Sequence, residues 1–390
     1  MKGLFRQKGA QLDINILASD EAQEFITTHA GILDGGFQKV EMSDKMRERL
    51  TRSNYIFSGI KTFHELNEAF PSMLDENGNK KPFERFLNDV QKINDTYNAN
   101  YLHAEYNFVQ ASATMAAKWE QFSEDGDRYN LQYRTAKDDK VRPEHAALDG
   151  VTLPMSDSFW ETYYPPNGWN CRCTVVQVRK QKYPATEHSD AMSRGEEAMN
   201  GERYNIFRFN SGKQGKTMPD YNPYTIRRCN DCDVAKGKLK LGFVPDYQLC
   251  QGCIMIRKCS EDRNRDNSAK ATKKSPEVKK LQGTTISNPD FNHEVLVTGG
   301  SIREWTNQPH KEYAAKNSIL KHIAKVFREA NYIGVVDNFK QKPGVIQSHL
   351  FETTVLGDVS WIVIREYDDG RFILHSLSDG DRIKTGIRKE

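Results

Sequence analysis

The stretch from Tyr133 to Val178 constrains the fold of this chain most. Residues 165–168 read Pro-Pro-Asn-Gly and force an extended path followed by a turn. Trp160 and Trp169 flank this turn, and their large apolar faces must be buried. The block has poor local propensity for helix or strand, so it is ordered only where a specific tertiary structure holds it. The sequence therefore predicts the core of a defined domain here, without naming an activity.

The residues that make this block distinctive are irregularly spaced, which makes a chance agreement with another sequence improbable. They are Asp138, Asp139, Val141, Arg142, His145, Leu148, Gly150, Phe159, Trp160, Pro165, Pro166, Asn167, Gly168, Trp169, Cys171, Arg172 and Cys173. The set resembles the signature of the phage Mu F-like head morphogenesis family, which comprises minor capsid proteins of tailed phages and prophages. The upstream stretch with Tyr106, Asn107, Ala111, Ala113 and Trp119 is similar to the lead-in helices of that family. The resemblance covers roughly residues 50 to 180. It implies a few copies per procapsid near the portal vertex, acting in head assembly or DNA delivery.

The composition indicates several small domains. The chain has 390 residues, of which 37% are hydrophobic and 28% charged, so two or three domains are expected. A net charge of only +3 gives no electrostatic argument for nucleic-acid binding by the whole chain. Basic residues do cluster between Arg257 and Lys280, where we prefer a solvated linker over a DNA-binding patch.

The hydropathy pattern gives no sign of a membrane segment. No apolar run approaches the ~20 residues that span a bilayer, and residues 1–15 lack the apolar region of a secretory signal. We therefore expect a protein that is made in the cytoplasm and stays soluble, with no membrane partner.

The periodicity predicts an α+β, multidomain chain. From Met46 to Gln121 apolar residues recur at helical spacing, interrupted by turn residues at 75–79, and predict two or three helices. Alternation at residues 129–133 and 174–178 predicts two strands that bracket the block. The predicted segments are an N-terminal extension (1–45), a Mu F-like head morphogenesis domain (46–180), a connector (181–225), a four-cysteine zinc-knuckle module (226–260), a polar flexible linker (261–284) and a nuclease-like α+β domain (285–390).

Four cysteines form two Cys-x-x-Cys pairs, Cys229 with Cys232 and Cys250 with Cys253, separated by 17 residues. Each such pair presents two thiolates from one turn, and four thiolates at ~2.3 Å complete a tetrahedral zinc shell. The gap matches that of zinc ribbons. We expect a structural Zn ion here, with no open position for water. The alternatives are two unrelated pairs of core cysteines, or an exchange of Cys259 for one of the four ligands.

A second candidate metal site combines His145 with Cys171 and Cys173. The Cys-x-Cys spacing puts both thiols on one face of a strand, which suits either a metal or a shared core. Three ligands are one short for a closed site, so we rank core packing ahead. Arg172 would point to the opposite face and could bind an acidic partner.

The C-terminal segment contains enough apolar residues to form a hydrophobic core of its own. A helix face is predicted at residues 319–327, and a hairpin joins residues 359–363 to 371–375 across Asp369-Gly370, which is a strong turn signal. A His-bearing helix ahead of a small antiparallel sheet resembles the barnase/EndoU/colicin/RelE-like nuclease domains appended to Mu F-like proteins.

The chemistry of such a nuclease needs no metal. A base takes the 2′-OH proton, an acid protonates the leaving group, and a cation stabilises the phosphorane. The resemblance implies His310 as acid or base, Lys311 and Arg365 as phosphate contacts, and His349 or His375 as a second catalytic group. Glu352 completes the candidate set of His310, Lys311, His349, Glu352, Arg365 and His375. The alternative is that each is a surface residue or a satisfied core residue.

These observations favour a phage or prophage minor head protein that carries a toxin-like ribonuclease domain. Its expected partners are portal and capsid proteins, DNA during packaging or ejection, and RNA as substrate of the C-terminal domain. Its expected location is the host cytoplasm during assembly and then the head of the virion. The alternative is a ribonuclease effector toxin whose N-terminal domain serves only for packaging or export.

Overall fold

The computed structural model divides into two compact units, Met1–Ser260 and Glu261–Glu390. It describes residues 1–7, 12–219, 224, 246–308, 313–338, 341–355 and 357–388, without the side chains of residues 100, 202, 246–250 and 381. The boundary between the units falls within one helix, α10 (Asp246–Lys274).

The first unit begins with short helices that pack on longer ones. They are α1 (Lys2–Arg6), the 3-10 helix η1 (Ile14–Ala18) and α2 (Asp20–Gly35). The Ser19 hydroxyl caps α2 by accepting a hydrogen bond from the backbone N–H of Ala22. Ile26, Ala30 and Leu33 recur on one face of α2 and are buried, which seats the helix against its neighbour α3. The predicted extension is therefore part of the core.

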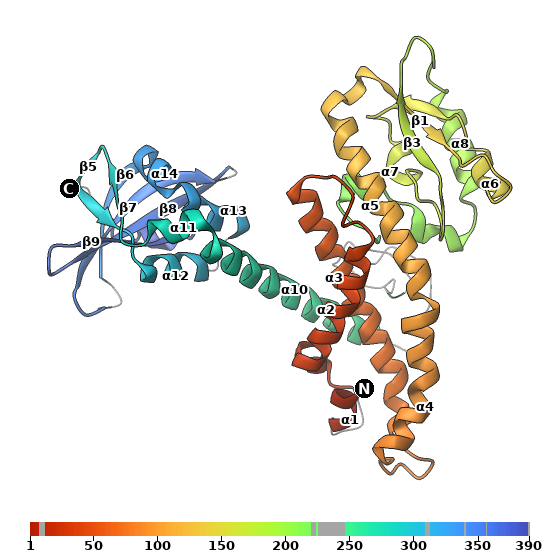
Figure 1. Ribbon diagram of the computed structural model, residues 1–390, viewed down its shortest axis with the longest axis horizontal. Helices are drawn as coiled ribbons and strands as arrows, with labels where there is room; N and C mark the ends of the chain where they lie inside the picture. The colour runs from red at the N-terminus through yellow and green to blue at the C-terminus, as the bar shows by residue number, and fades with distance from the viewer. Residues whose placement is uncertain are drawn as a thin grey trace. The chain divides into compact units, whose positions relative to one another are not determined.

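Long helices dominate the next part of the first unit (Figure 1). The elements are α3 (Asp44–Ala69), η2 (Phe70–Met73), α4 (Phe83–Asp95), the π-helical turn η3 (Thr96–Asn100) and α5 (Leu102–Asp125). The turn at residues 75–79 separates η2 from α4, and Gly78 adopts a φ of 77° there. The helices and the turn predicted from the sequence are confirmed.

A small sheet follows α5 and contains the stretch from Tyr133 to Val178, which we call the signature block. Its elements are η4 (Gly126–Arg128), β1 (Asn130–Arg134), α6 (Pro143–Ala146), β2 (Thr152–Pro154), α7 (Phe159–Thr162) and β3 (Thr174–Val178). The strand order is β2-β1-β3. β1 and β3 pair antiparallel from Asn130↔Val178 to Arg134↔Thr174. The two predicted strands are thus confirmed, and they are direct neighbours.

The segment predicted as an irregular connector is instead part of the first core as far as residue 219. It forms α8 (His188–Ala198), η5 (Glu202–Phe207) and α9 (Ser211–Gln214). Met199, Phe207 and Phe209 are buried in the same cluster as the signature block. Its apolar residues are few and irregularly spaced, so periodicity alone did not reveal them. Gly195 packs so closely on Tyr163 that an added Cβ would lie 2.5 Å from the ring.

The polar run predicted as a flexible linker is helical. Residues 261–274 complete α10, and α11 (Pro276–Leu281) follows after Ser275. Lys, Glu, Arg and Ala are good helix formers despite their polarity, and Ala269 and Thr272 are buried. Pro276 cannot continue α10 but suits the first turn of α11.

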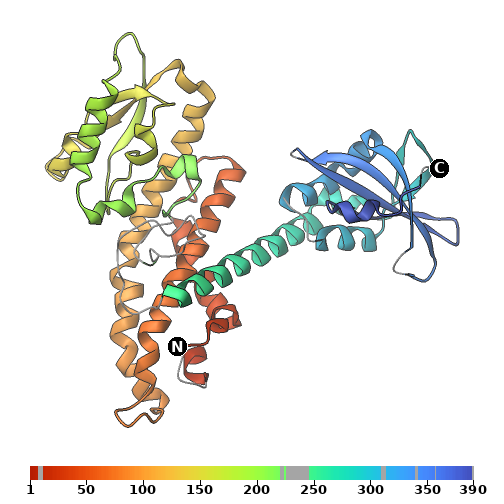
Figure 2. The ribbon, with the colours of Figure 1, turned by 180° about the vertical axis from the view of Figure 1, so that it is seen from behind.

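The second unit is a six-stranded sheet with its α-helices on one face, and Figure 2 shows it from behind. On the other face, Ile383 and Ile387 pack against Val336, Leu350 and Val363. Its elements are β4 (Thr285–Asn288), β5 (Phe291–Leu296), α12 (Gly299–Asn307), α13 (Tyr313–Ser318), η6 (Ile319–His322), α14 (Ile323–Glu329), β6 (Asn331–Asp337), β7 (Val345–Val355), β8 (Asp358–Tyr367), β9 (Phe372–Ser378) and η7 (Asp381–Lys384). The order is β4-β5-β9-β8-β7-β6, with β5 parallel to β9 and the other pairs antiparallel.

The predicted helix face and hairpin are both present in the second unit. Leu320, Ile323 and Phe327 are fully buried against the sheet. β8 and β9 form the hairpin across Asp369-Gly370, where Gly370 has a φ of 82°. Every helix in the described part of the chain is too short or too polar to cross a membrane.

Candidate functional site

The signature block folds around a buried aromatic and amide core. Trp160 is fully buried, and its indole N–H donates to the carbonyl of Pro154 at 2.9 Å. The Tyr133 hydroxyl donates to Asn167 Oδ1 at 2.8 Å. Trp169 packs edge-on against Phe108 of α5. These contacts tie the Pro-Pro-Asn-Gly turn to both the sheet and the long helices. The predicted burial is confirmed for Trp160, whereas Trp169 is only partly buried.

His145, Cys171 and Cys173 meet at one edge of this core. His145 lies on α6, a single turn that starts with Pro143, and the two cysteines immediately precede β3. His145 Nδ1 lies 3.8 Å from Cys171 Sγ and 3.9 Å from Cys173 Sγ. All three ligand atoms lie within 4.8 Å of one another, and among the described residues this is the group of His, Cys and carboxylate side chains that could hold a metal ion.

The electrostatics of the two thiols are coupled. A hydrogen bond from Cys173 is the largest cause that lowers the pKa of Cys171, and His145 lowers it further. The same bond, together with burial, raises the pKa of Cys173. The pair therefore favours one thiolate next to one thiol.

Arg172 lies between the two cysteines in the sequence, and its side chain is about half exposed. Its guanidinium binds both carboxylate oxygens of Asp138, at 2.5 and 2.7 Å. This bidentate pair lowers the pKa of Asp138 to about 2. The acidic partner of Arg172 is thus within the same chain. Arg142 donates to the Trp169 carbonyl at 2.6 Å and closes the other side of the loop.

The predicted four-cysteine zinc knuckle falls largely outside the described residues. Cys229, Cys232 and the side chain of Cys250 are not described. Cys253 lies on α10 and is buried, with its sulfur 3.3 Å from Arg257 Nε. A zinc ion at these four residues stays a prediction.

The candidate catalytic residues of the second unit do not converge on one point. The register pairs Arg365 with Ser348 and Glu352 with Trp361, which places both on the face opposite His349. His375 occupies the irregularity in the pairing of β8 and β9. His310 and Lys311 lie outside the described residues.

His349 instead belongs to a polar cluster that sequence reasoning missed. Its Nε2–H donates to Glu366 Oε2 at 3.0 Å, and its Nδ1 accepts from the Tyr332 hydroxyl at 3.0 Å. Gln347 donates to the same Glu366 oxygen. Burial raises the pKa of Glu366, but the hydrogen bonds from Gln347 and His349 outweigh it and leave the pKa below its ordinary value. The alternation of Gln347 and His349 along β7 was visible in the sequence, whereas the partner Glu366 required the strand register.

A second buried polar cluster joins the helices of the first unit. Lys61 Nζ lies 2.6 Å from Glu105 Oε2 and 3.1 Å from His29 Nε2. His29 Nδ1 contacts the Ser58 hydroxyl at 2.7 Å. Desolvation lowers the pKa of both Lys61 and His29. The cluster links α2, α3 and α5 across the core, and removing one of its members would leave the others buried without a partner charge.

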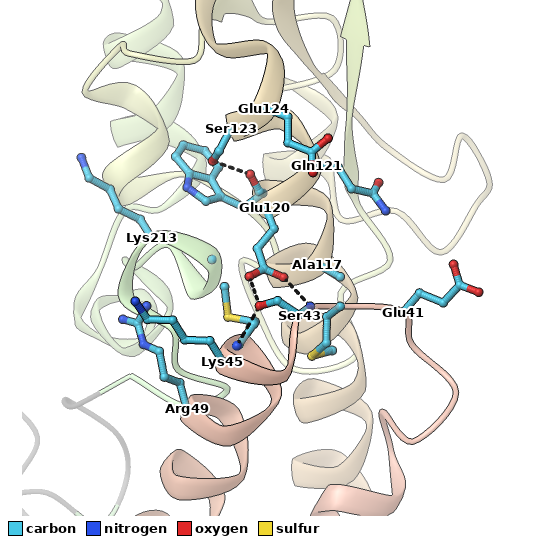
Figure 3. A pocket seen from close by; sticks show the side chains of 14 residues that line it. Glu41, Ser43, Lys45, Arg49, Ala117, Glu120, Gln121, Ser123, Glu124 and Lys213 are labelled. Atoms are coloured by element: carbon cyan, nitrogen blue, oxygen red, sulfur yellow. Dashed lines mark hydrogen bonds between the residues drawn. The ribbon is translucent and has the colours of Figure 1, made fainter. Parts of the chain in front are cut away.

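An open groove of about 690 Å³ lies where α3, α5 and α9 meet (Figure 3). Glu120 turns toward Ser43, whose hydroxyl and amide both donate to the carboxylate, at 2.5 and 3.1 Å. Arg49 donates to the Gln214 carbonyl, and Lys213 pairs with Glu161. These polar groups are engaged with one another and do not converge on a common point in the groove.

The first unit thus combines long lead-in helices with a small α+β domain built around the signature block. Residues 76–176 match the family model described as Phage Mu protein F like protein. Residues 264–374 match the model described as Large polyvalent protein-associated domain 3. The first match supports the Mu F-like resemblance of this part of the chain.

Two curated relatives are also similar to part of this chain. The chain is 30% identical over 177 residues to the "Putative capsid assembly protein F" of Escherichia phage Mu, covering 44% of this chain and 38% of the relative. It is 32% identical over 198 residues to the "Mu-like prophage FluMu F protein" of Haemophilus influenzae, covering 49% of this chain and 42% of the relative. The chain spans about two fifths of the length of these relatives. None of the solved structures matches the chain.

Proposed function

We propose that this protein is a minor head protein of a phage or prophage, acting in capsid assembly or DNA delivery near the portal. The observation that carries the proposal is the Mu F-like match at residues 76–176, together with relatives named for capsid assembly and for a Mu-like prophage. The matched segment includes the buried signature block, with Trp160 and Asn167 fully enclosed. Portal and capsid proteins are the proposed partners, and the virion head is the proposed final location.

Deletion of the gene from its parent phage or prophage tests this role. We expect fewer DNA-filled heads by electron microscopy and a lower titre, both restored by the full chain supplied in trans. Asn167→Ala should fail to restore them, because it removes the acceptor of the hydrogen bond from the Tyr133 hydroxyl inside the block. Asn77→Ala, in the exposed turn between η2 and α4, is the matched control and should restore them. Normal heads without the chain would contradict the proposal.

A ribonuclease in the second unit is our second candidate. The supporting observation is the Tyr332–His349–Glu366 relay, in which a carboxylate orients an imidazole, an arrangement that suits general acid–base chemistry. His349 is only 3% exposed, so its ring faces the core in this conformation. The head protein therefore stands first and the effector toxin second.

The ribonuclease proposal is tested with the purified full chain and total RNA in EDTA. Cleavage that is lost in His349→Ala and kept in His322→Ala, an exposed histidine of η6, supports the candidate. RNA that stays intact with the unaltered chain, or cleavage that survives His349→Ala, excludes this assignment.

A further inference from the structure

The thiols of Cys171 and Cys173 and the imidazole of His145 are arranged as metal ligands although they come from two separated parts of the loop. In tetrahedral zinc, bond lengths of about 2.3 Å to sulfur and about 2.0 Å to nitrogen imply a separation of roughly 3.5 Å between a sulfur and a nitrogen ligand. The observed separations from His145 Nδ1 are 3.8 and 3.9 Å. These two separations need to shrink by only a few tenths of an ångström, and the three ligand atoms lie within 4.8 Å of one another.

We propose that His145, Cys171 and Cys173 bind one zinc ion through Nδ1 and the two sulfur atoms. Two thiolates balance the charge of Zn²⁺, so the centre is neutral, which suits a site where His145 and Cys171 are 2% and 6% exposed. The carboxylate of Asp138, on the same loop, has both oxygens engaged by Arg172. Two sulfur ligands and one nitrogen select zinc over the harder cations.

The fourth position of this site is open to water. A cavity of about 20 Å³ adjoins the three ligands and is lined by Arg142, Asn170 and Arg172 among others. That volume accommodates about one water molecule. His145 Nε2 is buried and makes no hydrogen bond to any described residue. With the metal on Nδ1, this nitrogen carries the ring proton.

Such an ion explains how a segment with little regular structure is held. His145 belongs to a single turn of helix, and the cysteines lie in an extended stretch just before β3. The ion clamps these two segments together at the edge of the signature block. Since an unfolded chain does not present the three ligands together, the free energy of zinc binding stabilises the folded block.

The test uses the full chain, purified in reducing buffer and then incubated with zinc, and it separates this site from the predicted four-cysteine module. In the variant Cys229→Ser/Cys232→Ser the proposed ligands are intact. We expect this variant to retain one zinc per chain by elemental analysis. X-ray absorption should show two sulfur ligands and two lighter ones. Absence of bound zinc, or a shell of four sulfur ligands, overturns the proposal. Because the variant leaves the three proposed ligands unaltered, misfolding at the site does not explain such a result.

Two further variants in the same background assign the ligands. Cys171→Ser/Cys173→Ser should lose the zinc, whereas Cys259→Ser, which alters a partly buried cysteine of α10, should keep it. Zinc that survives Cys171→Ser/Cys173→Ser overturns the assignment. Protein purified without reductant is also examined by mass for a disulfide between Cys171 and Cys173. A disulfide that persists after incubation with zinc in reducing buffer overturns the assignment as well.

Discussion

Protonation of His64 is predicted to destabilise the first unit below neutral pH. This residue lies in the buried stretch of α3, is fully buried, and donates from Nε2 to the Tyr224 carbonyl at 2.5 Å. Burial lowers its pKa from the ordinary 6.5 to about 4, because the charged ring loses its hydration. The folded unit therefore holds His64 neutral over a range where the unfolded chain binds a proton.

The sign and size of the effect follow from the two pKa values. Between pH 6.5 and 4 the unfolded state binds more protons at this residue, so the free energy of unfolding falls as the pH is lowered. The full difference corresponds to about 3 kcal/mol, at 1.36 kcal/mol per pKa unit. Between pH 7 and pH 5 the part due to His64 is about 2 kcal/mol.

The assay compares the unaltered chain with His64→Gln, which can still donate a hydrogen bond but does not titrate. Urea unfolding at pH 7 and pH 5, read by hydrogen exchange in peptides of α3, follows the first unit separately. From pH 7 to pH 5, the free energy of unfolding should fall by about 2 kcal/mol more in the unaltered chain than in His64→Gln. His103→Gln, at an exposed ring on α5, is the control. Equal losses in the unaltered chain and His64→Gln would refute the reasoning.

Two other predictions concern packing in the first unit. Lys61→Met leaves Glu105 buried beside His29, and we expect it to cost about 3–5 kcal/mol in urea unfolding. Lys61→Met/Glu105→Gln should cost less than this single variant, and a larger loss would contradict the buried-pair argument. Gly195→Ala puts a Cβ 2.5 Å from the Tyr163 ring and should cost about 1–3 kcal/mol. Gly31→Ala on α2, where nothing lies within 4 Å, should instead be neutral or stabilising by up to ~1 kcal/mol in the same measurement.

The sequence was sufficient where the physical signal was local or dense. Helical periodicity between residues 46 and 121 predicted α3 to α5, and alternation predicted β1 and β3. The burial of Trp160 followed from its size alone. Asp369-Gly370 predicted the β8–β9 hairpin because few residue pairs adopt that turn without strain.

The sequence failed where structure depends on partners distant along the chain. Phe207 and Phe209 show no periodicity, yet they pack on Phe108 of α5. The polar residues at 261–274 suggested a linker, although their helix propensity is high. The ranking of core packing ahead of a metal for His145 and the two cysteines is not tested by the structure, but the cavity beside them could not be predicted from the sequence.

The candidate nuclease residues show the same limit. Their spacing in the sequence gave no strand register, and the register places His349 and Arg365 on opposite faces of the sheet. The partner that His349 does bind, Glu366, lies on the neighbouring strand β8.

Quantitative mass spectrometry of purified procapsids and virions tests the head-protein account most directly. The account predicts this chain in both particles, at a few copies for each head and far below the major capsid protein. Particles that assemble and fill with DNA yet contain none of the chain would contradict it.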